Sequence, residues 1–487
     1  MNGLPGSRQG LVSTLAALFA SAALSLGSIS TAAATPPGLP PGFVPSSPPV
    51  APVVRATDER SGDLIVYEPR PVLADELRAC SFRHPLCVHA SSGRAGKPRA
   101  GVVAKAGGAT DEVLAWLDAA DRAWDTATGA LDLPGPDASL ESGALDLYLV
   151  PGEPEATRTL LDRRDVVSGF DRASAFALVG SGAHRGCGLD AAAARVVARA
   201  ILFRVAPATD SGSALAESAS QAKLIVACAP RLDTEIGYFQ DHPEVGLADP
   251  LAPTSESVAA RNPGAPLVST ASELYGRGAS LFYDWLDARF GGYPGATLRA
   301  LWALRPTLTP VGAARWNDEP DGFDVLRTTF KDALRTGSTI DDLWLDFAVA
   351  RAFVPGLPVR VEWSVAWPQA PRTLLSGWGV APTGAAYVSV DCAKRPPGAR
   401  LRFEAHWEEH ARILWTLVRV DGAGHEMSRI AVPGPERGTD AQTTLVDLDG
   451  TARVLIVGSS AGDPLILFDP DDYRWETHGW TVSLGAE

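Results

Sequence analysis

The stretch that decides the fold lies near the middle of the chain, where residues 190–203 read DAAAARVVARAILF. Its alanines and long apolar side chains favour a helix, and Asp190 can cap its start, so we expect a helix over 190–205. A second helical segment over 213–228 follows after a short loop and carries Glu217 within Leu-Ala-Glu-Ser-Ala. The sequence therefore predicts two consecutive helices at the centre of the protein.

The spacing of apolar residues differs between the segments on either side of these two helices. Further helical segments are expected at 270–290, 296–304, 322–335 and 339–352. Before them, apolar strands alternate with a helix that begins near Thr110; after residue 355, short runs at period two are separated by Gly, Pro and Asp. The predicted fold class is therefore α+β, with a mixed α/β lobe over 61–186, a helical lobe over 187–355 and an antiparallel β-sandwich over 356–487.

The first sixty residues have the composition of a processing signal and a linker. Residues 11–30 are apolar and rich in small residues, and an Ala-x-Ala pattern follows at 32–34, which predicts a signal peptide over 1–34. Residues 35–60 are rich in proline, so we expect an extended linker. No later run has 18 consecutive apolar residues, and we expect no membrane span after signal cleavage. The expected location is secreted or periplasmic.

Composition and charge narrow the class of partner. The 487 residues carry a formal net charge of −14, with 46% hydrophobic and 21% charged residues, which is typical of a globular protein with ample core. A nucleic-acid binder needs a clustered basic surface, and the sequence has no long run of Lys or Arg. Nucleic acid is therefore excluded as the expected partner, and an unknown protein or glycan remains open.

Export makes disulfides possible, and the chain has five cysteines. Cys187 precedes the first central helix and Cys228 ends the second, so an antiparallel helix pair would bring the two together. A Cys187–Cys228 bridge would then join the two helices. Cys80 and Cys87 flank a short segment and are predicted to close a small loop, which leaves Cys392 as a buried, unpaired residue.

Residues of about 75–355 resemble bacterial secreted zincin-like metallopeptidases of the gluzincin type. In that family the active-site helix reads H-E-x-x-H, and a second helix supplies a metal-binding glutamate. Residues 195–199 read RVVAR and match that frame in its apolar positions, while Glu217 stands in a segment similar to the third-ligand stretch. Segments 274–286 and 342–348 resemble the family's later packing helices. The resemblance implies a mixed sheet, the two site helices and a helical lobe.

The departures from that motif remove its chemistry. Arg195 and Arg199 stand at the two histidine positions, and Val196 stands at the position of the catalytic glutamate. A catalytic zinc needs about three protein ligands and an open position for water. Guanidinium stays protonated and cannot serve as a ligand, and valine cannot accept a proton from water. The sequence therefore predicts no zinc, no cofactor and no catalytic residue among Arg195, Val196, Arg199 and Glu217.

A carboxylate left without its metal needs another positive charge, because a buried unpaired charge is costly. Arg199 can supply that charge to Glu217 as a bidentate pair. The hypothesis is a structural ion pair in a relic site. The alternative is that both arginines belong to a solvated helix face and that Glu217 is an ordinary residue.

A rival zinc motif lies at His406-Trp-Glu-Glu-His410, which fits H-x-x-E-H. That motif needs a helix, whereas the neighbouring residues alternate at period two. Residues four apart on a strand lie about 13 Å apart and cannot share one ion. A polar hairpin is the favoured interpretation, and the remaining histidines, including His84 and His89, show no ligand spacing.

A second rival is the segment GSSAG at 458–462, which matches the nucleophile elbow G-x-S-x-G. The elbow requires a helix next, but Asp463 is followed by Pro and an apolar strand pattern. His478 lies downstream with Asp469 and Asp471 between, so only the chain order fits a serine hydrolase.

Tryptophans gather in or near the predicted sandwich, at positions 363, 367, 378, 407 and 415. If these tryptophans are buried, they belong to the core, which is the favoured interpretation. If they are exposed, their rings can stack on sugar rings or on a partner.

Three hypotheses follow for function. The first is a secreted, catalytically inactive metallopeptidase-like protein with a binding or assembly role. The second is an active extracellular hydrolase whose ligands come from scattered His, Asp and Glu residues. The third is a surface module whose sandwich binds glycan or protein. A metal ion bound to the purified protein would distinguish the hydrolase hypothesis from the other two hypotheses.

Overall fold

The computed structural model describes the chain in ranges separated by gaps. These ranges are 55–57, 64–66, 70–73, 75–92, 108–150, 157–167, 170–182, 184–207, 209, 211–227, 232–248, 270–305, 320, 322–332, 339–434, 438–463 and 476–487. The predicted signal peptide and Cys228 lie outside the described residues, as does the predicted linker apart from 55–57.

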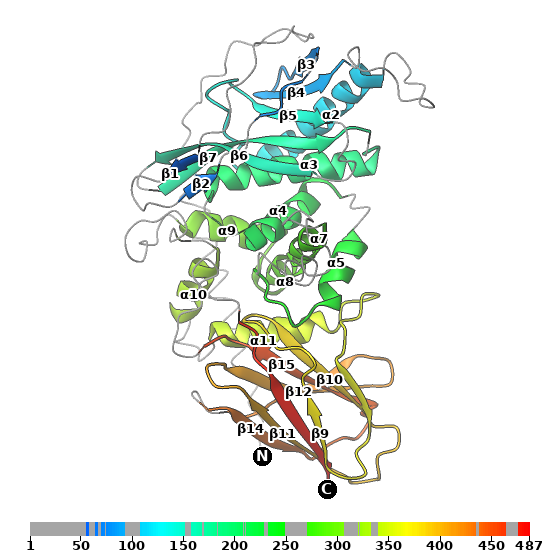
Figure 1. Ribbon diagram of the computed structural model, residues 1–487. Coiled ribbons are helices and arrows are strands. Elements are labelled where there is room, and N and C mark those ends of the chain that lie inside the picture. The colour runs from blue at the N-terminus through cyan, green and yellow to red at the C-terminus, as the bar shows by residue number, and fades with distance from the viewer. Residues whose placement is uncertain are drawn as a thin grey trace, which may run out of the picture.

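The upper part of the molecule is a mixed sheet with helices packed on it (Figure 1). A separate antiparallel pair is formed by β1 (Arg55–Thr57) and β2 (Leu64–Val66). The sheet has the order β3-β4-β5-β7-β6, with bounds β3 Glu76–Cys80, β4 Leu86–Ser91, β5 Leu145–Val150, β6 Thr157–Val167 and β7 Phe170–Gly180. Strands β4, β5 and β7 run parallel, while β3 and β6 are antiparallel to their neighbours. Helix α2 (Gly108–Asp125), extended by the π-helical turn Thr126–Ala130, joins β4 to β5.

Helix α3 (Cys187–Val205) lies between this sheet and the helical part of the chain. Val196 and Ala200 pack with residues of the sheet and α2, whereas Val197 and Ile201 pack into the helical core. A helix that is apolar on both sides must be buried on both sides. This explains why the stretch 190–203 carries few polar residues, and it confirms the helix predicted there.

The helical part surrounds a core of its own. Its helices are α4 Ser211–Ile225, α5 Leu232–Asp241, α7 Thr270–Gly278, α8 Ser280–Phe290, α9 Ala296–Leu304, α10 Gly322–Asp332 and α11 Ile340–Arg351. The single helix predicted over 270–290 is wrong in one respect, because it divides at Ala279 into α7 and α8. The fold class α+β is confirmed.

The lower part, residues 363–486, consists of two sheets and is called here the two-sheet region. One sheet has the order β13-β12-β15-β10-β8 and the other β14-β11-β16-β9. The bounds are β8 Trp363–Ala366, β9 Arg372–Leu375, β10 Ala385–Asp391, β11 Leu401–Trp407, β12 Ile413–Val420, β13 Glu426–Ala431, β14 Asp440–Leu445, β15 Arg453–Ser460 and β16 Trp480–Ala486. Val388 and Ile456 of the first sheet share a core with Phe403 and Val482 of the second. The expectation of a purely antiparallel arrangement is wrong, because β8 pairs parallel with β10.

Buried contacts join the helical part to the two-sheet region. Arg351, at the end of α11, is 2% exposed and donates to the side-chain oxygen of Gln240 at 2.8 Å. Gln240 in turn donates to the main-chain oxygens of Arg351 and Leu357. Tyr387 of β10 donates to the main chain of Ala348 at 2.6 Å. The bonds of Gln240 lie within the helical part and the segment that follows it, whereas the Tyr387–Ala348 bond and a shared apolar cluster pack α11 against the sheet that contains β10 and β15.

The cysteines follow the predictions where the structure describes them. Cys80 and Cys87 form a disulfide across β3 and β4, as predicted. Cys187 is disulfide-bonded as well, although its predicted partner Cys228 lies outside the described ranges. Cys392 is buried and free, as expected. Of the helices that the structure describes, none combines the length and apolar character needed to cross a membrane.

Candidate functional site

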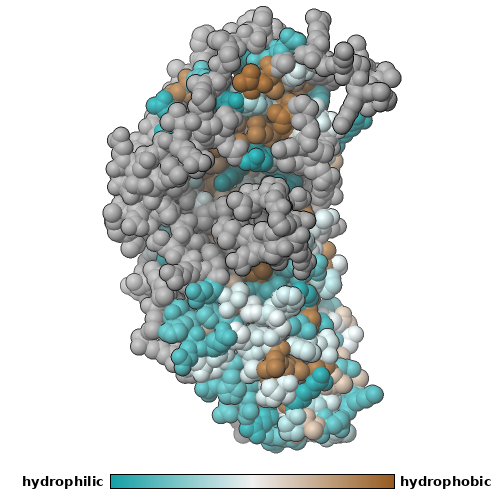
Figure 2. Space-filling model, viewed as in Figure 1, coloured by the Kyte–Doolittle hydropathy of each residue, from teal (hydrophilic) through white to brown (hydrophobic). Residues whose placement is uncertain are grey.

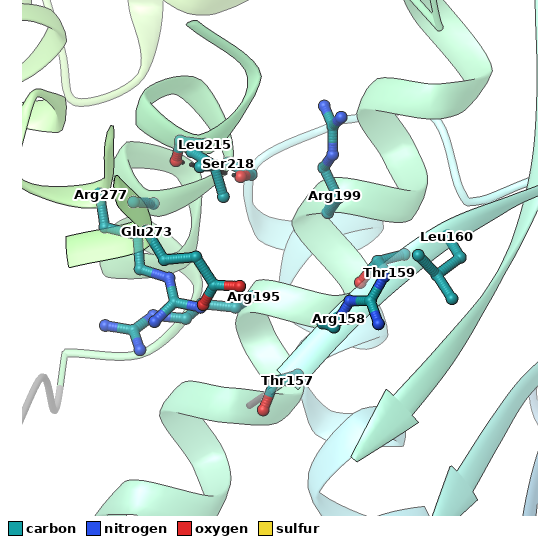
Figure 3. Close-up of a pocket in the computed structure, with 11 residues that line it drawn as sticks. Thr157, Arg158, Thr159, Leu160, Arg195, Arg199, Leu215, Ser218, Glu273 and Arg277 are labelled. Atoms are coloured by element: carbon teal, nitrogen blue, oxygen red, sulfur yellow. Dashed lines mark hydrogen bonds and ion pairs between the residues drawn. The ribbon is translucent and has the colours of Figure 1, made fainter. Parts of the chain in front are cut away.

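A cavity of about 250 Å³ opens where the sheet meets the helical part, and it is called here the arginine cleft (Figure 3). Four elements line it: the start of β6 and helices α3, α4 and α7. The lining residues are Thr157, Arg158, Thr159, Leu160, Arg195, Arg199, Leu215, Ser218, Ala219, Glu273 and Arg277. The cleft therefore combines four guanidinium groups with one carboxylate.

Helix α3 brings two of the predicted site residues to this cleft. Arg195 and Arg199 are one turn apart on the same face of α3, and both line the cavity. Val196 points elsewhere: it is fully buried and packs with the sheet and α2. Val196 therefore belongs to the hydrophobic core.

Glu217 does not line the arginine cleft. It is 1% exposed, and its carboxylate accepts hydrogen bonds from Tyr283 Oη at 3.2 Å and Trp302 Nε1 at 2.9 Å. Helix α4 presents Ser218 to the cleft instead. Neighbouring helix positions differ by about 100°, so Ser218 and Glu217 face different sides of α4.

The predicted Arg199–Glu217 ion pair stays a prediction, and the contacts described for the two residues are with other side chains. The guanidinium carbon of Arg199 lies 4.4 Å from the centre of the Phe203 ring, a cation–π contact along its own helix.

Arg195 has a different acidic partner. Its Nη2 atom lies 2.6 and 2.7 Å from the two carboxylate oxygens of Glu235, on α5. The side chain of Glu235 is only 2% exposed, whereas that of Arg195 is 23% exposed. Arg277 of α7 lies 3.9 Å from the same carboxylate and 2.8 Å from Glu273. Figure 3 shows Arg195 pointing toward Glu273 and Arg277, while Arg199 stands one turn further along α3.

Two glycines let α7 approach closely enough to place Arg277 here. A Cβ atom on Gly278 would lie 2.2 Å from the main-chain oxygen of Glu235, and one on Gly276 would lie 2.9 Å from the Leu215 side chain. Such distances are far inside van der Waals contact. The absence of a side chain at both positions therefore seats α7 against α5 and α4.

Sequence reasoning missed several residues of the cleft. Glu273 and Arg277 are four apart on α7, a spacing that supports a helical ion pair and could have identified them. Arg158 lies on β6, which is an edge strand. The charged residues of β6 interrupt the alternation of apolar and polar side chains by which a strand is recognised in a sequence. No local sequence pattern identifies Glu235 as a partner of Arg195, because the two residues are 40 positions apart in the sequence.

A second group of titratable side chains lies in the upper sheet. His89 contacts Glu76 through Nδ1 at 2.5 Å and Asp146 through Nε2 at 2.9 Å. Asp146 is fully buried and also accepts from Arg70 and Ser142, each at 2.5 Å.

Ionisation in this group follows from these contacts. Burial lowers the pKa of His89, but the hydrogen bonds and charges of Asp146 and Glu76 outweigh burial and raise it above 6.5. Burial raises the pKa of Asp146, but His89, Arg70 and the Ser142 hydroxyl outweigh it, so that pKa falls below 3.8. The group is therefore a charged network that ties β3, β4 and β5 together.

The two histidines of the rival zinc motif, His406 and His410, do not lie on one helix. His406 lies in β11, and His410 lies beyond the end of that strand with a φ of 64°. The predicted hairpin is wrong, because β11 and the next strand, β12, belong to different sheets. The residues between them are therefore a crossover between the two sheets.

The rival serine motif is part of a strand. Ser459 and Ser460 end β15 and are 1% and 0% exposed. His478 Nδ1 lies 3.7 Å from a carboxylate oxygen of Glu408, while Asp469 and Asp471 fall outside the described residues.

The tryptophans of the two-sheet region are mainly core, which was the favoured interpretation. Trp367, Trp407 and Trp415 are buried, and Trp378 is 59% exposed. Figure 2 shows a mainly hydrophilic face over the two-sheet region, with a small hydrophobic group within it.

Comparisons with known proteins assign no family. No family model matches the chain, and no curated protein matches it. The enzymatically active domain of tailspike protein 4 from bacteriophage CBA120 aligns with a TM-score of 0.16 and 10% identity, over 24% of this chain and 19% of that one. So slight a likeness carries no argument. Within the described ranges, no group of three or more His, Cys, Asp or Glu side chains is arranged to hold a metal ion.

Proposed function

We propose that this protein is a secreted, non-catalytic, zincin-like protein that binds a ligand outside the cytoplasm. The proposal includes a zincin-like body formed by the upper sheet and the helices, followed by a β-sandwich formed by the two-sheet region. The observation that carries it is the Arg195–Glu235 ion pair, at the helix position where the resembled family has its first metal ligand.

The contacts of the other relic positions support the same interpretation. A hydrolytic zinc site needs imidazole or carboxylate ligands and a base beside the bound water. Val196 is instead part of the core, and Glu217 is held by Tyr283 and Trp302 on the far side of α4 from the cleft. The side chains that remain in the cleft have the chemistry of binding, since guanidinium groups donate hydrogen bonds and carry charge.

The experiment is a peptidase assay on the purified protein with denatured protein substrates, with and without a chelator. The proposal expects no cleavage above that of a mock purification, and no difference for Glu217→Ala. Chelator-sensitive cleavage that disappears in Glu217→Ala would contradict it. That result would favour the alternative of an active hydrolase with a non-standard site.

A second candidate function rests on Trp378, the exposed tryptophan of the two-sheet region, which lies near exposed Leu375 in the sequence. Exposed aromatic rings stack on sugar rings, so this surface suits a glycan. Glycan binding that is lost in Trp378→Ala and retained in Arg158→Gln would favour this candidate over the cleft.

A further inference from the structure

We infer that the disulfide between Cys80 and Cys87 is a thiol–disulfide exchange site. In this site a dithiol reductant attacks the sulfur of Cys80, and Cys87 leaves as a thiolate that binds Arg78. The disulfide joins β3 to β4, where the two cysteines are directly opposite each other. The inference goes beyond the proposed function and does not depend on it, because it concerns the upper sheet and not the arginine cleft.

The contacts of Arg78 carry the argument. Its Nη2 atom donates to the sulfur of Cys87 at 3.2 Å, while its Nε atom is buried without a hydrogen-bond partner. Within the described ranges, the guanidinium of Arg78 pairs with no carboxylate. A half-buried charge without a counter-ion is costly. Reduction of the disulfide supplies that counter-ion, because it creates a thiolate at the sulfur that Arg78 already contacts.

Two carboxylates lie on the same face of the sheet as the disulfide, and each has partners of its own. Asp146 contacts His89 and Arg70, and Glu76 contacts His89. Arg78 is therefore the cation available to a thiolate at this point of the sheet. An adjacent cation stabilises a thiolate relative to the thiol, and so it favours the reduced form of the pair.

The two sulfurs differ in exposure, and this sets the direction of attack. Cys87 is 3% exposed and lies on the inner strand β4, whereas Cys80 is half-buried on the edge strand β3. Ala79 and Val88 pack with α2, so the disulfide lies on the opposite face of the sheet. An external thiolate therefore reaches Cys80 more readily, and exchange is faster when the leaving thiolate is the stabilised one.

The exchange balances in two steps. One thiolate of the reductant attacks Cys80 Sγ, the bond between the two cysteines breaks, and its electron pair stays on Cys87. The second thiol of the reductant then loses its proton and attacks the reductant sulfur of the mixed disulfide, so that Cys80 leaves and takes up a proton. The dithiol is oxidised to a disulfide, and the two electrons that it loses reduce the protein disulfide.

The test is equilibration of the purified full chain with mixtures of reduced and oxidised dithiothreitol, without denaturant. Alkylation followed by peptide mass spectrometry measures the reduced fraction of Cys80 and Cys87. We expect the disulfide to be reduced in the folded protein. Arg78→Gln should need about a tenfold higher ratio of reduced to oxidised reagent for half reduction, because it loses a charged contact to the thiolate.

Three further measurements make the result specific. Arg78→Lys keeps the charge and should recover part of the difference. Arg83→Gln removes the same charge from the loop between the cysteines, where the side chain pairs with Asp125, and should leave the ratio unchanged. Brief reaction of the wild type with glutathione, quenched with acid, should place the adduct on Cys80.

The ionisation of Cys87 provides a readout that a purely structural role of Arg78 would not move. In Cys80→Ser, the ultraviolet absorbance of the Cys87 thiolate should appear at a lower pH than in Cys80→Ser/Arg78→Gln. Near-ultraviolet circular dichroism checks that each variant is folded.

The inference is overturned if the disulfide of the folded protein stays oxidised at the highest excess of reduced dithiothreitol. It is also overturned if Arg78→Gln and Arg83→Gln shift the ratio equally, or if the glutathione adduct forms on Cys87. None of these outcomes affects the peptidase assay, so the proposed function and the exchange site stand or fall separately.

Discussion

Arg195 Nη2 lies 2.6 and 2.7 Å from the two carboxylate oxygens of Glu235, and this ion pair joins α3 to α5 beneath the arginine cleft. Glu235 is almost entirely buried, so its charge depends on neighbouring cations, of which Arg195 is the nearest. Arg195 thus has a structural role, because it holds α3 against α5.

Substitution of Arg195 should therefore destabilise the protein. Loss of one partner from a buried ion pair leaves the other charge uncompensated, and we expect Arg195→Met to lower the free energy of unfolding by about 3 kcal/mol. The double variant Arg195→Met/Glu235→Met should recover much of that loss, because it removes the stranded carboxylate. Denaturant unfolding measures both. Equal losses in the single and double variants would show that the pair is not what stabilises the contact.

Glu217 should behave as a buried hydrogen-bond acceptor. Glu217→Ala leaves Tyr283 Oη and Trp302 Nε1 without this acceptor, and unsatisfied buried donors cost about 1–3 kcal/mol each. Glu217→Gln keeps one acceptor oxygen and should lose less stability than Glu217→Ala. Thermal and denaturant unfolding provide the comparison. Unchanged stability in Glu217→Ala, together with an altered metal content, would contradict this role of Glu217.

The network around His89 predicts a dependence of stability on pH. The pKa of His89 is raised above 6.5 in the folded protein, so its contribution is complete below pH 6.5 and is lost as pH rises through the folded pKa. The pKa of Asp146 is lowered below 3.8, so its contribution is present above about pH 3.8 and is lost as pH falls.

His89→Gln should abolish the fall in unfolding free energy as pH rises above 6.5. His425→Gln, at a side chain that is 79% exposed, is the matched control and should retain the fall. Unfolding measured from about pH 5 to about pH 9 tests this. Identical profiles for the wild type and His89→Gln would contradict the assigned role of the network.

The glycines of α5 and α7 offer a matched pair of substitutions. Gly278→Ala places a Cβ 2.2 Å from the main-chain oxygen of Glu235, so α7 must move away from α5. Gly237→Ala, within α5, meets nothing within 4 Å and should stabilise the helix by about 0.5–1 kcal/mol. We expect Gly278→Ala to destabilise the protein. Similar stabilities for the two variants would show that the close approach is not required.

Local patterns in the sequence were sufficient for the main elements of the fold. The apolar residues of 190–203 predicted α3, and the change to period two after residue 355 predicted strands such as β11 and β15. The division of this segment at Ala279 into α7 and α8 was not predictable from helical spacing alone. The parallel pairing of β8 with β10 depends on the path of the chain between them, which periodicity does not report.

The candidate site was predictable only in part. Residue spacing placed Arg195 and Arg199 on one face of α3, and the structure brings both to the cleft. The hypothesis of an Arg199–Glu217 pair rested on resemblance to a motif, and such a resemblance does not fix which side of α4 faces α3. Glu235 takes that role for Arg195 through a contact between α3 and α5 that local sequence does not encode.

The metal content of the purified protein tests the central claim most directly. Under the proposed function, mass spectrometry after dialysis against trace zinc should find far less than one zinc ion per chain. The reason is that guanidinium groups and a core valine stand at the positions of α3 where the resembled family has its ligands and its base. One zinc ion per chain, removable by a chelator and lost in Glu217→Ala, would contradict the account and identify a metal centre.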